Sequence, residues 1–299
     1  MHLDVVVIGN VGIDTNVYLL GSGLDLSVES NFTENIDCIG QAGGYASFSY
    51  KQLGKRTGFI GYVGNDLNGN FIRQSFSKSS IDTTALFIDP AGTNRSINLM
   101  FKDGSRKNFY DGKSHMNLQP DIELCRKVLA KSQLVHFNIP NWARLLLPIA
   151  RDLNLKIACD IQDVISADDP YRQDFIKYAD FLFFSCVNHE NPKLLVDSFI
   201  KSNKNLTVIC GMGALGCAVG IEDRLIFFPP PNLELPVVDT NGAGDTLAAV
   251  FLSSHLLDGY PLHESILRAQ IAARYTCAQR ASSSNLITAE TLDKLAMSL

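Results

Sequence analysis

The stretch Asp239-Thr240-Asn241-Gly242-Ala243-Gly244-Asp245 leads directly into an apolar, helix-forming run over residues 247–257. Small residues at a helix start leave the first backbone N–H groups accessible, and together with the positive end of the helix dipole they can hold an anion. Asp245 would lie beside that anion, where like charges repel. Its presence is explained if it accepts a proton from a hydroxyl that attacks a phosphoryl group held by the amides. The alternative is an Asp that only complements the helix dipole.

Composition places the chain among ordinary globular enzymes. It has 299 residues, of which 46% are hydrophobic and 19% charged, with a net charge of −5. These values exclude a basic footprint for nucleic acid, and no apolar run reaches membrane-spanning length. Seven scattered cysteines without a Cys-x-x-Cys pair, and no secretory layout at the N-terminus, predict a cytoplasmic protein with free thiols. No repeat or linker divides the chain, so we expect one domain over residues 1–299.

Short apolar runs alternate with helical patterns along most of the chain. The runs, typical of buried parallel strands, cover residues 3–9, 57–63, 134–137, 155–159, 181–184 and 206–210. Helical patterns lie between them at 44–53, 69–79, 122–131, 142–153, 173–178 and 192–201, and a last one covers 262–280. This alternation predicts an α/β fold with a mostly parallel central sheet and helices on both faces.

Two segments interrupt the alternation, at about 16–39 and 84–110. The first is polar and marked by glycines, and the second contains alternating stretches such as Ser96-Ile97-Asn98-Leu99-Met100-Phe101. Both patterns favour antiparallel strands outside the main sheet. Two distant insertions could form a small β-sheet lid over a cleft. An extension of the sheet edge explains the pattern equally well.

Two further glycine motifs contribute to the prediction. Gly211-Met212-Gly213-Ala214-Leu215-Gly216 fits a dinucleotide-binding pattern, but a strand-like segment follows instead of a helix, which favours a glycine-rich hairpin near a nucleotide. Gly9-Asn10 ends the first predicted strand, and Asp14 follows. Because ligands of open α/β sheets bind at the carboxyl ends of strands, Asp14 is a candidate acceptor for two vicinal hydroxyls, or simply a turn residue.

With these elements the chain resembles the PfkB/ribokinase family of carbohydrate and nucleoside kinases over nearly its whole length. Residues 239–245 resemble the family's C-terminal signature, and Gly61-Tyr62-Val63-Gly64-Asn65-Asp66 with Gly69 resembles its N-terminal signature. The resemblance implies a ribokinase-like fold with a β-sheet lid. It also implies transfer of phosphate from ATP, with Mg²⁺, to a hydroxymethyl group of a sugar or sugar derivative.

The resemblance also implies roles for individual residues. Asp245 would be the catalytic base, and the amides of Gly242, Ala243 and Gly244 would stabilise the transferred group. Substrate would contact Asn10, Asp14, Gly40, Gly44, Tyr45, Asn138 and the lid residue Arg106. The nucleotide would lie along Asn188, Glu190, Gly211, Gly213 and Gly216, and a monovalent cation such as K⁺ would bind near Asp239.

Several positions depart from the family pattern. Tyr45 stands where the family has an asparagine that contacts the sugar, so a ring could stack there or narrow the pocket. At the usual N-x-x-E motif, Ser185 and Asn188 stand in its places if the spacing is kept, or Asn188 and Glu190 could supply the polar contacts by a small shift. Gly211 replaces a threonine. A nucleoside kinase and a sugar-binding relative without turnover are therefore alternatives. The edge of the lid could also pair two copies into a homodimer.

Overall fold

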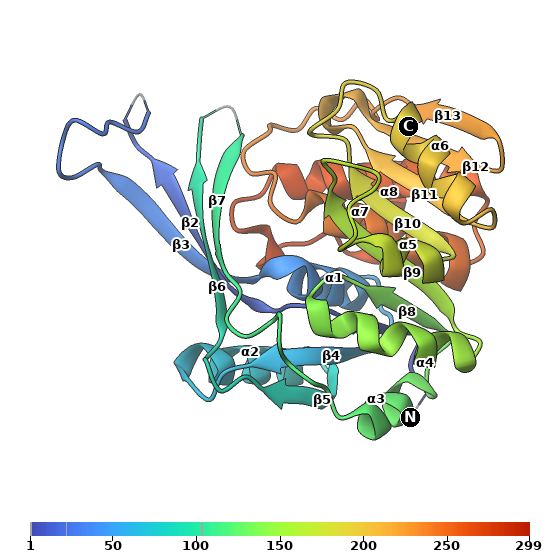
Figure 1. The fold of residues 1–299 in the computed structure, drawn as a ribbon. Helices are drawn as coiled ribbons and strands as arrows, with labels where there is room; N and C mark the ends of the chain where they lie inside the picture. Colours follow the sequence, from blue (N-terminus) through green and yellow to red (C-terminus); the bar gives the residue numbers. More distant parts are fainter. Residues whose placement is uncertain (1, 22, 103) are drawn as a thin grey trace.

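A computed structural model describes residues 2–21, 23–102 and 104–299 (Figure 1). Nine strands form the large sheet in the order β13-β12-β11-β10-β9-β8-β1-β4-β5. The pairs from β11 to β5 are parallel, and β12 and β13 join antiparallel at one edge. The strands are β1 (Val5–Ile8), β4 (Thr57–Val63), β5 (Asp82–Ile88), β8 (Leu134–Phe137), β9 (Lys156–Asp163), β10 (Phe181–Ser185), β11 (Thr207–Gly211), β12 (Cys217–Ile221) and β13 (Arg224–Phe228).

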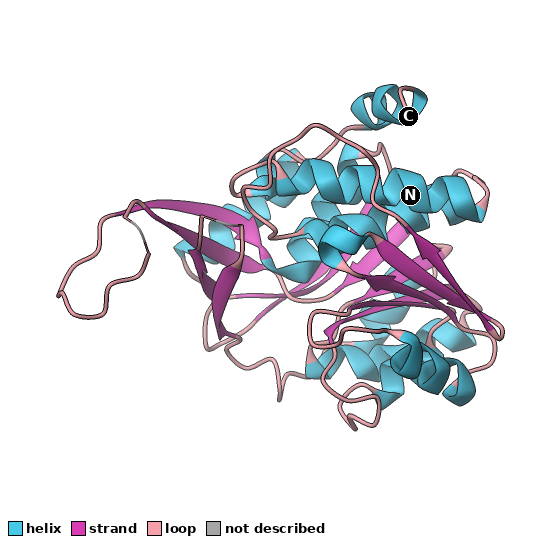
Figure 2. Cartoon of the chain, turned by 90° about the horizontal axis from the view of Figure 1, so that it is seen from above, coloured by secondary structure: helices cyan, strands magenta, loops and turns pink. Residues whose placement is uncertain are grey.

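Helices cover both faces of this sheet (Figure 2), which confirms the predicted α/β class. One face carries α3 (Ile122–Leu129), α4 (Leu147–Asp152), α5 (Gln173–Tyr178) and α6 (Lys193–Ser202). The other carries α1 (Gln41–Gln52), α2 (Leu67–Lys78), α7 (Ala243–Leu252), α8 (Leu262–Cys277) and α9 (Ala289–Met297). The continuous apolar character of β1 follows from this arrangement, because Val6 and Ile8 enter one core and Val5 and Val7 the other.

A second sheet of four strands, in the order β3-β2-β6-β7, projects from the large one (Figures 1 and 2). It consists of β2 (Gly12–Leu19), β3 (Thr33–Gly40), β6 (Asn94–Met100) and β7 (Arg106–Asp111). Two details differ from the sequence-based expectation. Residues 84–88 belong to β5 of the large sheet, and the central pair β2–β6 is parallel rather than antiparallel.

The sequence patterns also missed some elements. Phe227 and Phe228 belong to β13, which pairs with β12 at the edge of the large sheet. The terminal helix α9 was not expected. The apolar run 247–257 is continuous but changes geometry, because α7 ends at Leu252 and a π-helical turn follows over Ser253–Leu257.

Candidate active site

The N-terminus of α7, the carboxyl ends of the parallel strands and one face of the small sheet meet at a common edge of the molecule. The register of the small sheet places Asp14 of β2, Ser96 of β6 and Tyr110 of β7 side by side. Side chains directly opposite one another on neighbouring strands lie on the same face. The sequence motifs therefore come together from four distant segments.

The start of α7 is an accessible cradle of backbone amides. Gly242 precedes the helix with a φ of 74°, a left-handed conformation that favours glycine. Gly244 is exposed, and a Cβ built on it would meet no atom within 4 Å. In the first turn of an α-helix the N–H groups have no carbonyl partner within the helix. The Ala243 N–H makes only a long contact of 3.4 Å with the Thr240 carbonyl oxygen. This end of the helix can therefore receive an anion.

Tyr45 of α1 lies directly beneath this cradle. A Cβ on Gly242 would come within 2.3 Å of Cδ1 of the Tyr45 ring, and Tyr45 itself is only 2% exposed. Its hydroxyl lies 3.9 Å from the Cys38 sulfur. The ring packs against the backbone of Gly242 and supports the cradle, and its contact with a sugar stays a prediction.

Asp245 follows in the first turn of α7 and is partly exposed. Burial against the protein raises the pKa of its carboxyl well above the usual range, the Asp160 charge raises that pKa further, and the Arg106 guanidinium opposes the shift. The carboxylate of Asp245, beside the cradle, therefore has an increased affinity for a proton. A general base needs such tuning in order to accept a proton near neutral pH.

Asp160 was missed by the sequence analysis. It stands near the carboxyl end of β9, is 6% exposed, and burial raises the pKa of its carboxyl to about 6. The Gln162 N–H donates to it at 2.9 Å. The available signal was an acid placed directly after the buried run 155–159, at the sheet edge where ligands of α/β folds bind.

Asp14 forms the floor of the region between the small sheet and α1. It is 5% exposed, and burial raises the pKa of its carboxyl to about 6 although hydrogen bonds from Gln41 oppose the shift. The Gln41 backbone N–H and Nε2 donate to it at 3.4 and 3.2 Å. Gly40 is required by this contact, because a Cβ there would lie 2.1 Å from an Asp14 carboxylate oxygen.

Gln41 is a second residue that the sequence analysis did not assign. Its φ is 65°, a strained value for a side chain with a Cβ, and its Nε2 also donates to the Ser96 hydroxyl at 2.7 Å. Across the sheet, Asn10 Nδ2 donates to the Tyr110 hydroxyl. The polar groups of β2, β6, β7 and α1 thus line one continuous surface beside the cradle.

Two further predicted residues lie directly after β8 and in the first turn of α1. The amide of Asn138 is buried against Gly9, and neither of its polar atoms has a hydrogen-bond partner within the described residues. Gly44 is buried and packs on Val11 and Ile39, where a Cβ would meet their side chains at 3.4 and 3.5 Å. Asn138 therefore has capacity to bind a ligand, whereas Gly44 serves close packing.

The predicted nucleotide side is an open turn after β11. Gly213 and Gly216 adopt φ values of 58° and 91°, and the turn Gly213–Leu215 between them is exposed. β12 follows, which confirms a hairpin rather than a dinucleotide-binding helix. Asn188 and Glu190 are both exposed after β10, and Asn188 Nδ2 contacts an Asp163 carboxylate oxygen at 3.3 Å. Their contacts with a nucleotide stay predictions.

The N-terminal signature has a structural role here. Asp66 caps α2 by accepting from the Gly69 N–H at 2.7 Å, and it also accepts from the Thr93 hydroxyl and N–H at 2.6 and 2.8 Å. Gly69 is needed because a Cβ would lie 2.0 Å from the Gly64 carbonyl oxygen. This cluster fixes the chain just before β6 and so anchors the small sheet.

Asp239 is fully buried and already accepts three hydrogen bonds. The Tyr18 hydroxyl, the Asn241 N–H and the Ala281 N–H donate to its carboxylate at 2.7, 2.8 and 3.3 Å. These donors stabilise a carboxylate without a cation. A potassium site near Asp239 stays a prediction.

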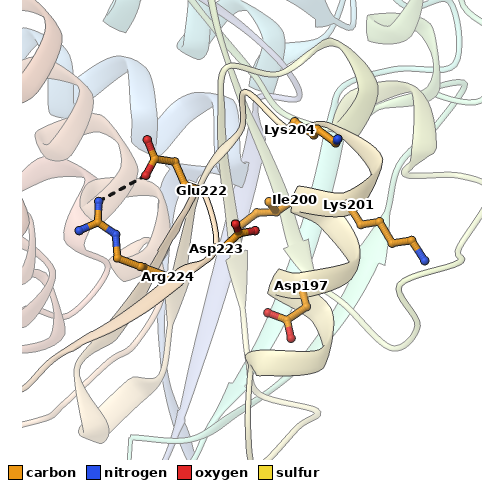
Figure 3. Close-up of a pocket in the computed structure, with 7 residues that line it drawn as sticks. All are labelled: Asp197, Ile200, Lys201, Lys204, Glu222, Asp223 and Arg224. Carbon is orange, nitrogen blue, oxygen red and sulfur yellow. Dashed lines mark hydrogen bonds and ion pairs between the residues drawn. The ribbon is translucent and has the colours of Figure 1, made fainter.

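A groove elsewhere on the surface is not a candidate for the active site (Figure 3). It lies between α6 and the β12–β13 turn, at the amino end of β11, whereas the cradle and the glycine turn lie at the carboxyl ends of the strands. Its lining mixes acids and bases without a convergent polar centre: Asp197, Ile200, Lys201, Lys204, Glu222, Asp223 and Arg224.

Comparison with known proteins supports the assignment that the geometry suggests. The profile described as pfkB family carbohydrate kinase matches residues 3–289. The chain belongs to the pfkB family of carbohydrate kinases. It is accordingly a kinase of sugars, a phosphotransferase with an alcohol group as acceptor.

Individual pfkB relatives cover nearly the whole chain. An acarbose 7(IV)-phosphotransferase from Actinoplanes sp. is 27% identical over 280 residues, 92% of each chain. A fructokinase from Salmonella typhimurium is 21% identical and covers 90% of this chain and 94% of its own. The solved structure of a microbiome-derived acarbose kinase, Mak1, is 26% identical with a TM-score of 0.91, covering 99% of this chain and 100% of its own. The ribokinase-like fold is thereby shown.

No helix among the described residues is long and apolar enough to cross a membrane. Within the same residues, no group of three or more His, Cys, Asp or Glu side chains is arranged to hold a metal ion.

Proposed function

We propose that this kinase transfers the γ-phosphoryl group of ATP to a hydroxymethyl group of a sugar or sugar derivative, with Asp245 as the base. The observation that carries the proposal is the placement of Asp245 beside the open amides at the start of α7. Its raised pKa suits proton transfer from the acceptor hydroxyl, while the amides of Gly242, Ala243 and Gly244 stabilise charge on the moving phosphoryl group.

Arg106 of the small sheet supports the same region from the opposite side. Its guanidinium donates to the Thr240 hydroxyl at 3.0 Å, and its charge opposes the rise that burial causes in the pKa values of Asp14 and Asp245. A cation at this place would attract the phosphate groups and oppose the negative charge of the neighbouring acids. The small sheet would thus act as a lid that excludes water from the transfer step.

The residues present fit a magnesium ion that is bound partly by a protein carboxylate and partly by phosphate oxygens, rather than by a complete set of protein ligands. Mg²⁺ in such enzymes is held by one or two carboxylates together with phosphate oxygens. Asp160 is close enough to Asp245 for its charge to raise the pKa of Asp245, and it is the carboxylate that would hold the ion, which leaves Asp245 free as the base. When bound, the ion supplies neutralisation of phosphate charge.

Asp14, with Asn138 and Asn10, would hold the acceptor hydroxyls. We propose acarbose as the first acceptor to test, since the Actinoplanes relative and Mak1 are named for it. An open side of the site supports a large acceptor, because all six residues of β7 are exposed.

The test is a panel of acarbose, D-fructose, D-ribose and adenosine, scored by ADP release and by phosphorylated product. Asp245→Asn should lower kcat by about 10²- to 10⁴-fold on the best acceptor while nucleotide binding persists. Asp197→Asn, an exposed change on α6, is the matched control and should leave kcat unchanged. Full activity of Asp245→Asn refutes the assigned base, and the absence of ADP release with all three sugars refutes the proposed acceptors.

A further inference from the structure

A row of asparagine side chains connects the small sheet to the loop that forms the cradle. Asn108 Nδ2 donates to Asn98 Oδ1 at 2.7 Å, and Asn98 Nδ2 donates to Asn16 Oδ1 at 3.0 Å. Asn241 Nδ2 donates to the same Asn16 oxygen at 3.0 Å. We call these four residues, Asn108, Asn98, Asn16 and Asn241, the amide ladder.

The amide ladder is buried except at its outer end. Asn16, Asn98 and Asn241 are 0%, 1% and 4% exposed, whereas Asn108 is exposed on β7. Buried amides without partners cost free energy, and their mutual hydrogen bonds are stronger in a low dielectric than in water. Apolar side chains would fill the same space without fixing a geometry. The choice of asparagine therefore specifies how the segments sit against one another.

Sheet register sets the first three positions. Asn16 is directly opposite Asn98, and Asn98 is directly opposite Asn108. The same face carries Asp14, Ser96 and Tyr110 one rung away, where the acceptor sugar would bind. A slip of one residue in either pairing would turn an amide to the other face and break the ladder.

The amide ladder ends in residues 239–241, immediately before Gly242. Each of these three residues is hydrogen-bonded to a side chain of the small sheet. Asp239 accepts from Tyr18 of β2, and Thr240 accepts from Arg106 of β7. Asn241 donates to Asn16, and its own carbonyl oxygen accepts from the Ser282 hydroxyl at 3.1 Å. The peptide that leads into the cradle is therefore fixed by contacts across more than 200 residues of sequence.

We propose that the amide ladder is a positioning device that ties the geometry of the phosphate cradle to the placement of the small sheet. The inference rests on the proposed function of the cradle. Asn108, at the exposed end, lies on the face that an acceptor would contact, so an acceptor settled against β7 orders Asn108. The hydrogen bonds of Asn98 and Asn16 then restrain the side chain of Asn241. The four residues act through Gly242 and do not touch the reacting atoms.

The test compares Asn98→Ala with Asn35→Ala, an exposed asparagine of β3 outside the ladder. Hydrogen exchange of the amides of residues 239–246, measured without substrate, should quicken about tenfold or more in Asn98→Ala and stay unchanged in Asn35→Ala. In turnover with MgATP, Asn98→Ala should lower kcat about tenfold while the KM for ATP stays within about twofold. The double variant Asn98→Ala/Asn241→Ala should lose no more than the worse single variant.

Unchanged exchange over residues 239–246, or full kcat in a variant that has only lost thermal stability, overturns the proposal. If Asn98→Ala does not fold, Asn108→Ala at the exposed end replaces it, with the same expected changes in exchange and kcat. The exchange measurement needs no turnover. A wild-type chain that phosphorylates no sugar therefore refutes the proposed function and leaves the exchange result to decide on the ladder.

Discussion

The contact between Gly242 and Tyr45 allows a worked prediction for Gly242→Ala. An alanine at a φ of 74° costs about 1 kcal/mol relative to glycine. Its Cβ would also lie 2.3, 2.6 and 2.8 Å from Cδ1, Cε1 and Cγ of the Tyr45 ring. Because that ring is 2% exposed and packed, it cannot swing aside, and overpacking of this kind costs about 1–3 kcal/mol. We expect a total loss of roughly 2–4 kcal/mol in unfolding free energy.

Urea denaturation of the two single variants and the double variant separates these two contributions. Tyr45→Ala alone should cost about 3–5 kcal/mol, because it leaves a cavity. In that background the added methyl group enters free space, so Gly242→Ala should then cost only the backbone strain of about 1 kcal/mol. The activity of Gly242→Ala should fall about a hundredfold in kcat, since the first cradle amide moves.

Equal costs of Gly242→Ala in the two backgrounds would refute the reasoning, because the ring would then not be the obstacle. A loss below about 0.5 kcal/mol would refute it as well, since neither strain nor overlap would be present. Gly259→Ala is the matched control for the backbone contribution. Its φ is 76° and no atom lies within 4 Å of the added carbon, so about 1 kcal/mol is expected there without any coupling to Tyr45.

Three more predictions concern the acceptor side. Gly40→Ala forces a carbon against the Asp14 carboxylate and should raise the KM for sugar at least about tenfold while the KM for ATP is unchanged, as steady-state kinetics will show. Asp14 has a folded pKa of about 6 against an ordinary 3.8, so its contribution to stability is present at low pH and is lost as the pH rises from about 4 to 6. The stability of Asp14→Asn relative to wild type should therefore increase by roughly 2–3 kcal/mol between pH 4 and pH 7 in urea titrations, and a pH-independent difference contradicts the shift. Tyr110→Phe removes the acceptor of the Asn10 amide and should weaken sugar binding about three- to tenfold by calorimetry, with nucleotide binding unaffected.

The local features of the fold were open to prediction from sequence alone. A buried parallel strand must be apolar on both faces, so runs such as 57–63 and 134–137 were predicted with the boundaries that the structure shows. The glycines around Ala243 predicted an exposed helix start, because only residues without bulk leave those amides open. Burial, strand periodicity and helix-start chemistry act over a few residues, and a sequence displays them directly.

Tertiary structure decided the features that join distant segments. The ring of Tyr45 lies under Gly242, almost 200 residues away, and Asp160 comes close enough to raise the pKa of Asp245. The parallel pairing of β2 with β6 and the amide ladder from Asn108 to Asn241 likewise depend on sheet register. A lone tyrosine, aspartate or asparagine has no local pattern that reveals its partner. Such contacts form only when the whole chain packs. Here they determine which ring supports the backbone at Gly242 and which hydrogen bonds hold the segment before it.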